Sequence, residues 1–519
     1  MKSKVFQKPR LGHLLCGVAS GLMLYLSFPP ADLSFLAWIA AAPILWLAAE
    51  DPKKAVVPAY AGGAIWFLGG LAWVRHATGP GMILLGLFLA VYLVGFAVVT
   101  GVLRRRLAAP LAIIAPIVWV SLEGIRSNFM TGFPYLLLGH TLVDSPALVQ
   151  ILDVTGVYGA SFVVMSCSGL VAEIAIARRA HSLKPTAISL AIVAAAVATA
   201  LIYSHHRLKT LKTRPGPEVC VVQPSIPQDI KAEWTSERLL DTMARYERLT
   251  SACLENAEAP SPLLIWPESA LPGFYNEVET SWISFVRKKL NNIMRENKIE
   301  RFIIGMNTSD RGPDGELRDM FNSALYLHGH YDDYERYDKI HLVPFGEYVP
   351  LARLLFFIRG VVPYEKPFAA GSKYKLFDYN DHKFGILICY EDVFPGLVRR
   401  FVAGGAEFLV NISNEGWFFM SAEAEQHLAI ARCRAIEARV GMVRATNSGI
   451  SCLIGPDGRV EKIIEKDGRT KLVAGSLAGR VTLGSAPPTL YTRFGDVFAL
   501  LCIAGGITAA AAAFRRNPR

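Results

Sequence analysis

Two patterns of apolar residues divide the chain. Nearly continuous apolar runs of about 17 to 25 residues, long enough to cross a bilayer core of about 30 Å, fill the first part of the sequence and recur once near its end. The first run is expected to be a retained span rather than a signal peptide, because no small-residue cleavage site followed by a soluble domain appears. We expect about eight transmembrane helices, near residues 12–28, 32–49, 55–74, 81–103, 108–123, 158–177, 186–203 and 494–514.

Residues 216–485 follow a different pattern, in which short β-branched runs alternate with amphipathic helices. This alternation indicates sheets covered by helices. Strands are expected at 219–224, 263–269, 302–308, 323–329, 384–390, 408–413 and 448–455. Helices are expected at Trp234–Ala257, Ser281–Asn297 and Glu423–Val440. The chain is therefore predicted to contain a seven-span bundle over 1–204, an α/β layered domain over 216–485 and a last membrane helix over 494–514.

Positive charge gathers beside alternate spans. The chain is 52% hydrophobic and 19% charged, with a net charge of +10. Basic residues concentrate at 2–10, 53–54, 104–106, 178–184 and 515–519. By the positive-inside rule, both termini then lie in the cytoplasm and the long segment 204–490 on the opposite side. The basic balance therefore records topology rather than a nucleic-acid partner, although further basic residues follow the seventh span on its outer side, namely Arg207, Lys209, Lys212 and Arg214.

The eight cysteines show no Cys-x-x-C pair and no Cys/His spacing of the zinc type, so no metal site is expected. Five of them lie in the long outer segment, at positions 220, 253, 389, 433 and 452. An odd number in an oxidising compartment leaves at least one without a partner in the chain. Which of them pair stays open.

Three polar residues stand where chemistry could be done. Cys389 ends an apolar strand before a helix, where backbone N–H groups can lower its pKa and hold an oxyanion. Glu268 ends a strand beside Trp266, where partial burial would suit a general base. Lys339 lies in an apolar stretch, where a fixed ammonium suits a developing oxyanion. Singly, each has an ordinary alternative: a buried structural cysteine, a solvated carboxylate and a surface lysine.

Together the three motifs are more specific. The segments WPES at 266–269, YDKIHLVPFGE at 337–347 and ICYED at 388–392 resemble those of the nitrilase or carbon–nitrogen hydrolase superfamily, over roughly residues 216–485. The resemblance implies an α-β-β-α sandwich with Glu268 as the base, Lys339 as the oxyanion stabiliser and Cys389 as the nucleophile.

With the membrane half included, the whole chain resembles the bacterial apolipoprotein N-acyltransferase family. The further segments that carry this likeness are GFPYLLLG at 132–139, DVTGVYG at 153–159, QPSIPQ at 223–228 and RATNSG at 444–449. In two places the chain departs from the family: NEGWF at 414–418 replaces the usual Asn-Asp-Ala-Trp-Phe, and a tryptophan follows the Ile-Pro-Gln motif at a slightly longer spacing. The resemblance implies supporting or substrate-binding roles for Glu347, Tyr390, Glu391, Trp234 and Trp417, with ordinary loop packing as the alternative.

The resemblance also implies partners and a location. An acyl group would pass from a phospholipid to a thioester on Cys389, and then to the α-amine of the N-terminal diacylglyceryl cysteine of an apolipoprotein. No cofactor is implied, a monomer is expected, and the location would be a bacterial inner membrane with the catalytic domain on the periplasmic side. Several aromatic residues could line an acyl-chain wall, with core packing as an equal alternative: Phe345, Tyr348, Phe356, Phe357 and Trp417.

Two rival functions remain at this point. One is a membrane-tethered nitrilase-type amidase that hydrolyses small C–N substrates with the same three residues. The other is a transporter or scaffold whose extramembrane domain has no activity.

Overall fold

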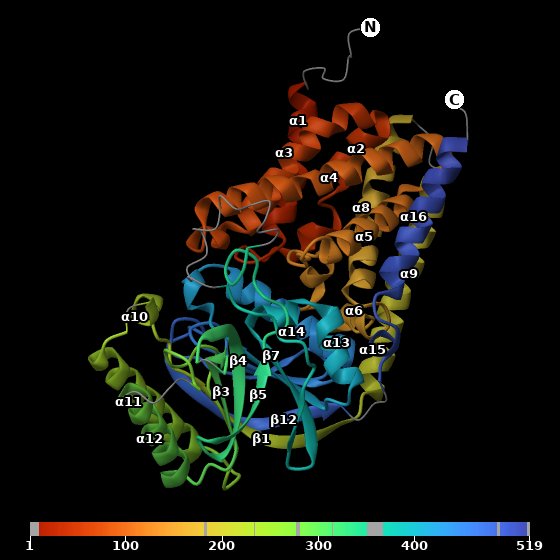
Figure 1. Ribbon diagram of the computed structural model, residues 1–519. Helices are drawn as coiled ribbons and strands as arrows, with labels where there is room; N and C mark the ends of the chain where they lie inside the picture. Colours follow the sequence, from red (N-terminus) through yellow and green to blue (C-terminus); the bar gives the residue numbers. More distant parts are fainter. Residues whose placement is uncertain are drawn as a thin grey trace. The chain divides into compact units, whose positions relative to one another are not determined.

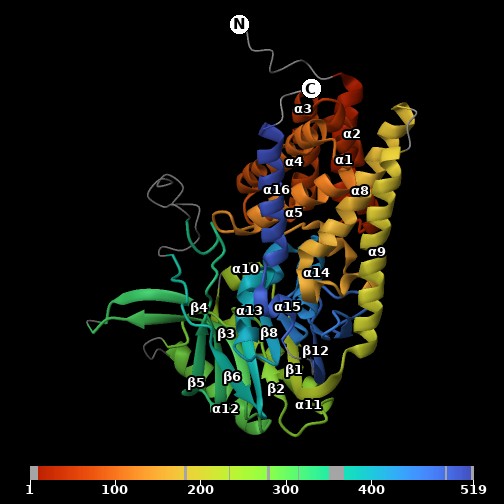
Figure 2. The ribbon, with the colours of Figure 1, turned by 90° about the vertical axis from the view of Figure 1, so that its right-hand side faces the viewer.

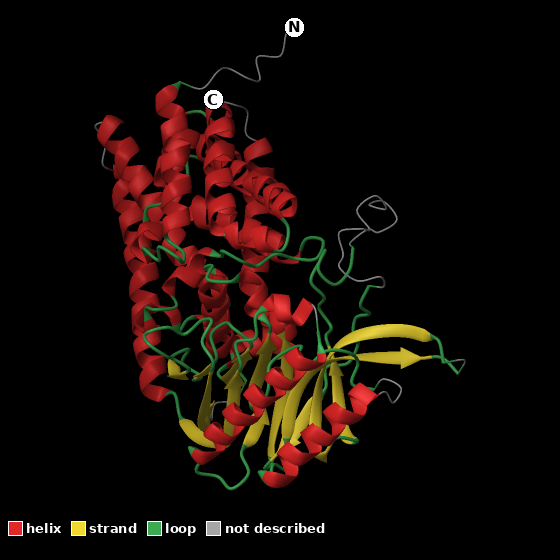
Figure 3. Cartoon of the chain, turned by 90° about the vertical axis from the view of Figure 1, so that its left-hand side faces the viewer, coloured by secondary structure: helices red, strands yellow, loops and turns green. Residues whose placement is uncertain are grey.

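The chain folds into two compact units. A computed structural model describes residues 10–180, 184–232, 234–276, 281–313, 315–349, 367–484 and 488–515. The first unit consists of residues 1–210, 421–437 and 489–519, and the second of 211–420 and 438–488. Every named strand belongs to the second unit (Figure 3). The helix α14 (Glu423–Ala438), which the sequence placed inside segment 216–485, groups with the membrane helices of the first unit.

The first unit is a helical bundle. Within it α16 (Val497–Arg515) packs against α5 (Leu111–Asn128), so the last span joins the first ones (Figure 2). The remaining elements of this unit are α1 (Leu11–Leu26), η1 (Ser34–Trp38), α2 (Ala42–Glu50), α3 (Pro52–Gly70), η2 (Ala72–His76), α4 (Gly79–Leu107), η3 (Leu138–Leu142), α6 (Pro146–Val149), α7 (Leu152–Thr155), α8 (Val157–Ala180), α9 (Lys184–Thr210) and α15 (Leu490–Phe494).

The expectation of about eight spans is confirmed only in part. Among the described residues, five helices are long and apolar enough to cross a membrane: α4, α5, α8, α9 and α16. The first three expected spans fall short for physical reasons. The helix α1 has 16 residues, or about 24 Å at 1.5 Å per residue, which is less than a bilayer core. A 3₁₀ turn and a break divide the second expected span into η1 and α2, and lysines and glycines lower the mean hydropathy of α3.

The second unit is a sandwich of two six-stranded sheets covered by helices (Figure 1). The sheet orders are β12-β1-β2-β3-β4-β5 and β11-β10-β9-β8-β7-β6. In each sheet the middle strands pair in parallel and the outer ones antiparallel. The strands are β1 (Thr213–Gln223), β2 (Leu263–Ile265), β3 (Phe302–Arg311), β4 (Leu317–His330), β5 (Asp333–Asp338), β6 (Leu376–Tyr379), β7 (His382–Ile388), β8 (Phe408–Ser413), β9 (Gly441–Thr446), β10 (Cys452–Ile454), β11 (Val460–Ile463) and β12 (Gly475–Gly484).

Helices cover the sheets on their outer faces. In the first sheet α11 (Ser236–Glu255) packs on β1 and β12, and α12 (Ser281–Glu296) on β4, while α13 (Pro395–Ala403) packs on β7 of the second sheet. The fully buried Trp266 stacks on Tyr246 of α11 at 4.0 Å between ring centroids. Shorter elements of this unit are α10 (Gln228–Ala232), η5 (Cys389–Val393) and η6 (Glu415–Phe418). The nitrilase-like layered fold expected for this segment is therefore confirmed.

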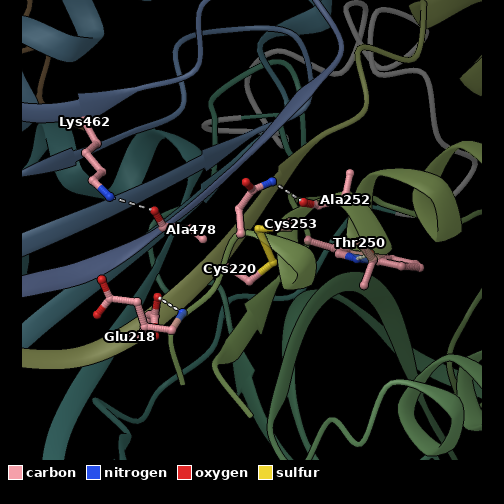
Figure 4. The surroundings of a disulfide bond; sticks show 10 residues. Glu218, Cys220, Thr250, Ala252, Cys253, Lys462 and Ala478 are labelled. Atoms are coloured by element: carbon pink, nitrogen blue, oxygen red, sulfur yellow. Dashed lines mark hydrogen bonds between the residues drawn. A yellow bond between two sulfur atoms is a disulfide. The ribbon is translucent and has the colours of Figure 1, made fainter. Parts of the chain in front are cut away.

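A disulfide answers part of the open question about cysteine pairing. Cys220 on β1 is bonded to Cys253 on α11, and their Cα atoms lie 6.0 Å apart (Figure 4). Cys389, Cys433 and Cys452 are thiols. The bond attaches α11 to the first sheet, inside the apolar core of the second unit.

Carboxylates neutralise two of the basic residues that disagreed with the positive-inside pattern. Arg207 at the end of α9 pairs with the buried Asp153 through Nε and Oδ2 at 2.5 Å. Arg214 on β1 pairs with Glu407 at 2.5 Å. Since each pair cancels a charge, the end of α9 and the strand that follows it are together less basic than their sequence suggests.

Candidate active site

The three residues singled out from the sequence belong to two sheets of the second unit. Glu268 follows β2 and Lys339 follows β5, both in the first sheet, whereas Cys389 follows β7 in the second. Hydrogen bonds fix the backbone of Lys339 on both sides, because its N–H donates to Asn322 O at 2.9 Å and its carbonyl accepts from Gly371 N at 2.8 Å. The site therefore forms where the carboxyl ends of strands from both sheets meet.

Lys339 lies between two carboxylates. Its Nζ is 2.9 Å from Oε1 of Glu347 and 3.7 Å from Oε1 of Glu268. The lysine is 1% exposed, so its ammonium has lost nearly all contact with water. Burial alone would lower the pKa of Lys339, but Glu347, Glu268 and the nearby Cys389 sulfur together raise it above its ordinary value. The ammonium of Lys339 is therefore held in its charged form beside the two carboxylates.

Cys389 stands on a sharp turn between strand and helix. Its φ is +53°, a left-handed conformation that few non-glycine residues adopt. Strain of this kind concentrates at functional sites, where it exposes a side chain at a strand end. The carbonyl of Cys389 accepts from Nδ2 of Asn411 at 3.0 Å, which fixes the turn to β8. The sulfur lies close enough to Lys339 to interact with its charge, so the structure brings all three residues together.

Two asparagines that sequence reasoning missed orient the carboxylates. Nδ2 of Asn322 donates to Oε1 of Glu268 at 2.7 Å and to Oε1 of Glu347 at 2.9 Å. The backbone N–H of Asn414 donates to Oε2 of Glu268 at 2.8 Å. Both oxygens of Glu268 are thus held, which aims the carboxylate. The available signals were a polar residue directly before the strand expected at 323–329 for Asn322 and the NEGWF segment for Asn414.

Glu391 accepts hydrogen bonds from the segment around Lys339 and from the residue before Cys389. Its carboxylate accepts from the hydroxyl of Tyr337 at 2.9 Å and from the N–H groups of Ile340, His341 and Ile388 at 2.7, 3.2 and 2.8 Å. Tyr337, Ile340 and His341 are neighbours of Lys339 in the sequence. Ile388 directly precedes Cys389. Burial raises the pKa of Glu391 to about 7, against the effect of these hydrogen bonds. Glu391, which is fully buried, therefore connects the segment that carries Lys339 to the turn that carries Cys389.

The other expected residues differ in their surroundings. Tyr390 is half-buried next to Cys389, its ring 4.9 Å from that of Phe394, and burial raises the pKa of its hydroxyl. Trp234 packs against the apolar core that contains Trp266. Trp417 is 41% exposed, and Phe345 is 39% exposed.

Of the remaining expected aromatic residues, Tyr348 packs against the small cluster of Met320, Leu342 and Phe368. Phe356 and Phe357 lie outside the described residues. The described residues that were expected to line an acyl-chain wall thus include both exposed and packed side chains.

Comparison with known proteins covers both halves of the chain. Residues 20–170 match the family described as Apolipoprotein N-acyltransferase N-terminal domain, and residues 218–474 match the family described as Carbon-nitrogen hydrolase. An apolipoprotein N-acyltransferase of Geobacter metallireducens is 37% identical over 523 residues, which cover 98% of this chain and 96% of that protein. The apolipoprotein N-acyltransferase of Haemophilus ducreyi is 30% identical, and the match covers 93% of this chain and 94% of that protein. The one of Rickettsia prowazekii is 32% identical, over 75% of this chain and 73% of that protein.

Proposed function

This chain belongs to the apolipoprotein N-acyltransferase family, and from that premise we propose that Cys389 carries the acyl group, Glu268 moves the protons and Lys339 stabilises the oxyanion. Its acceptor is a lipoprotein and its setting a membrane. The observation that carries the residue assignment is the placement of Lys339, 3.7 Å from Oε1 of Glu268 and within electrostatic reach of the Cys389 sulfur.

In the first half-reaction the acyl donor is a phospholipid. Glu268 takes the thiol proton of Cys389, and the thiolate attacks the ester carbonyl of the lipid. The oxyanion that develops is stabilised by the Lys339 ammonium, which is already in place and needs no reorganisation. The carbon–oxygen bond breaks, Glu268 returns the proton to the departing alkoxide, and a lysophospholipid leaves a thioester behind.

In the second half-reaction the acceptor is the α-amine of an N-terminal diacylglyceryl cysteine. Its nitrogen attacks the thioester carbonyl, and Lys339 again stabilises the oxyanion. The carbon–sulfur bond breaks as the amide forms, and Glu268 carries a proton from the nitrogen to the sulfur of Cys389. The thiol is regenerated, so the cycle needs no cofactor.

We place the second unit on the periplasmic side of a bacterial inner membrane. Supporting this side are the basic residues of the expected cytoplasmic loops, with Arg104, Arg105 and Arg106 in the last turn of α4 and Arg178 and Arg179 in that of α8. The Cys220–Cys253 bond is a second support, because disulfides persist in oxidising compartments. Both proposed substrates are anchored in lipid, which suits a catalytic unit attached to a membrane.

The amidase alternative has less support than acyl transfer. The same three residues could hydrolyse a small amide, but such a reaction gives no reason for the membrane domain matched over residues 20–170. Relatives that match nearly the whole chain carry the acyltransferase name.

Intact-mass measurement tests this function directly. The full-length protein in detergent micelles is incubated with a phospholipid of defined acyl chains, and we expect a mass increase of one acyl group. Addition of a synthetic peptide with a diacylglyceryl cysteine at its N-terminus should remove that mass and give the N-acylated peptide. Hydrolysis of small amides with no acyl adduct from the lipid would instead favour the amidase.

A further inference from the structure

A second lysine, Lys231, lies next to Glu268, and the mechanism above does not use it. Nζ of Lys231 donates to the carbonyl of Ser269 at 2.9 Å, so its ammonium sits beside the residue that follows Glu268. The described charged group that interacts with Lys231 is the Glu268 carboxylate itself. One carboxylate therefore interacts with two lysines from different elements, α10 and the segment after β5.

The segment that carries Lys231 is attached to the site by hydrogen bonds. Nδ2 of Asn414, whose backbone N–H holds Glu268, donates to Oε1 of Gln228 at 3.3 Å. The side chain of Asn447 donates to Ile226 O at 2.8 Å and to Oδ1 of Asn414 at 2.9 Å. Lys231 follows this bonded segment in the same short helix as Gln228. Its position beside Glu268 is thus built into the fold of the second unit.

The two lysines differ in the groups that surround Nζ. Lys339 faces two carboxylates, which raise its pKa despite burial. Lys231 instead donates to a neutral carbonyl, and its burial lowers its pKa to about 7, whereas the Glu268 carboxylate, among the described residues, acts in the other direction. Lys339 therefore stays charged through the reaction, whereas Lys231 can exist as a neutral amine near neutral pH.

The proposed reaction releases one proton that the three central residues cannot absorb. The first half-reaction is proton-neutral, because the thiol proton ends on the leaving alkoxide. The second is not: an α-amine has an ordinary pKa of about 7.7–8.0 and is mostly an ammonium at pH 7. The ammonium must lose one proton before its nitrogen can attack, and Glu268 is already committed to carrying another from nitrogen to sulfur.

We propose that Lys231 accepts this surplus proton, so that the acceptor's α-ammonium becomes a nucleophilic amine inside the site; the inference rests on the function proposed above. One N–H bond of the α-ammonium breaks and one forms on Nζ of Lys231, giving a neutral amine and a lysine ammonium. After the amide has formed, Lys231 returns the proton to water.

The test separates the two half-reactions. The full-length protein and the variants Lys231→Met and Lys231→Arg are first acylated with a phosphatidylethanolamine of defined acyl chains in detergent micelles. The rate at which the synthetic diacylglyceryl-cysteine peptide removes the thioester is then measured by intact mass from about pH 6 to 9. The exposed Lys373→Met serves as the matched control.

We expect all variants to acquire the thioester as the wild type does, which shows that the fold and the first half-reaction are intact. The thioester of the wild type should then be consumed with an apparent pKa near 7, the pKa of Lys231. In both Lys231 variants the apparent pKa should rise toward that of a free α-amine, which makes them roughly fivefold slower at pH 7 and equal to the wild type near pH 9.

The variant Lys231→Arg distinguishes two roles of Lys231, the transfer of a proton and the balancing of the Glu268 charge. Arginine keeps a positive charge beside Glu268 but is effectively always protonated and cannot accept a proton. Restoration of the wild-type pH profile by Lys231→Arg would overturn the proposal, and so would an unshifted profile in Lys231→Met. Failure of the wild type itself to form a thioester would instead count against the proposed function and not against the role of Lys231.

Discussion

Gly305 lies directly against the backbone of Glu268. A Cβ atom on residue 305 would meet the Cα of Glu268 at 2.5 Å and Pro267 O at 2.7 Å. Backbone atoms cannot move aside as a flexible side chain could. The strand β3 can therefore lie this close to the backbone of Glu268 only with a glycine at position 305. The hydrogen bond from Ala270 N to Gly305 O at 2.8 Å keeps the two segments together.

Gly305→Ala should therefore slow acylation of Cys389. The added methyl group pushes Glu268 away from Asn322 and Asn414, and a displacement of about 1 Å can cost on the order of a hundredfold in rate. Single-turnover formation of the thioester, followed by intact mass, measures the effect. Gly396→Ala on α13 is the control, since a Cβ there meets nothing within 4 Å and acylation should stay at the wild-type rate. Equal rates for both variants would mean that the position of Glu268 does not limit acylation.

Cys389→Ser should abolish the acyl-thioester. A serine hydroxyl is a far weaker nucleophile than a thiolate at neutral pH, and the lysine–carboxylate arrangement at this site suits an ionised sulfur. Intact mass after incubation with phospholipid is the measurement, and treatment with hydroxylamine distinguishes a thioester from an ester. Cys16→Ser, at a partly exposed position on α1, should acquire the acyl group like the wild type. A hydroxylamine-sensitive adduct that persists in Cys389→Ser would assign the nucleophile to another cysteine.

Lys339→Met should slow acylation by about 10²- to 10³-fold, the usual effect of removing one group that stabilises an oxyanion. The loss should appear in the rate of the chemical step at saturating phospholipid, because the ammonium acts on charge that develops in the transition state. Circular dichroism and gel filtration establish that the variant is folded.

The exposed Lys373→Met is the control for this measurement as well. Acylation of Lys339→Met at the wild-type rate would exclude Lys339 from transition-state stabilisation. A lower apparent affinity for lipid with an unchanged chemical step would assign it to ground-state binding instead.

The sequence predicted the strand ends of the site better than the contacts among its residues. Seven expected strands correspond to β1, β2, β3, β4, β7, β8 and β10, because apolar β-branched runs mark strands that are buried on both faces. Glu268 and Cys389 could be placed because such runs end at them. The strand β9 was missed because Arg444 interrupts its apolar pattern, although that arginine is buried.

Contacts between side chains depend on register, which no local pattern shows. The roles of Asn322 and Asn414 illustrate this. Asn322 faces Glu268 only because β3 and β4 pair with Asn307 opposite Asn322. Asn414 reaches Glu268 from the end of β8 in the other sheet. A hydropathy profile likewise cannot show where a helix breaks. Spans were therefore expected near residues 12–28 and 32–49, where the structure has a short helix and an interrupted one.

Arg444 connects two turns of the site through a fully buried ion network. Its Nη1 lies 2.8 Å from Oδ2 of Asp392, three positions after Cys389 in the same turn, and its Nη2 lies 2.6 Å from Oε1 of Glu415, which follows Asn414. All three side chains are at most 3% exposed. The guanidinium thus holds the nucleophile turn and the segment whose N–H binds Glu268 in one arrangement.

Arg444→Met should therefore both destabilise the second unit and slow acylation. Removing the cation leaves two buried carboxylates uncompensated, which costs about 3–5 kcal/mol. Chemical unfolding followed by tryptophan fluorescence measures the loss, and thioester formation below the unfolding transition measures the rate. Arg459→Met is the matched control, because its partner Asp457 lies 3.5 Å away and the arginine is 63% exposed, so its ion pair should contribute little. Similar unfolding midpoints for both variants would show that the buried network does not stabilise the fold, while a stable Arg444→Met that acylates slowly would assign the arginine to positioning alone.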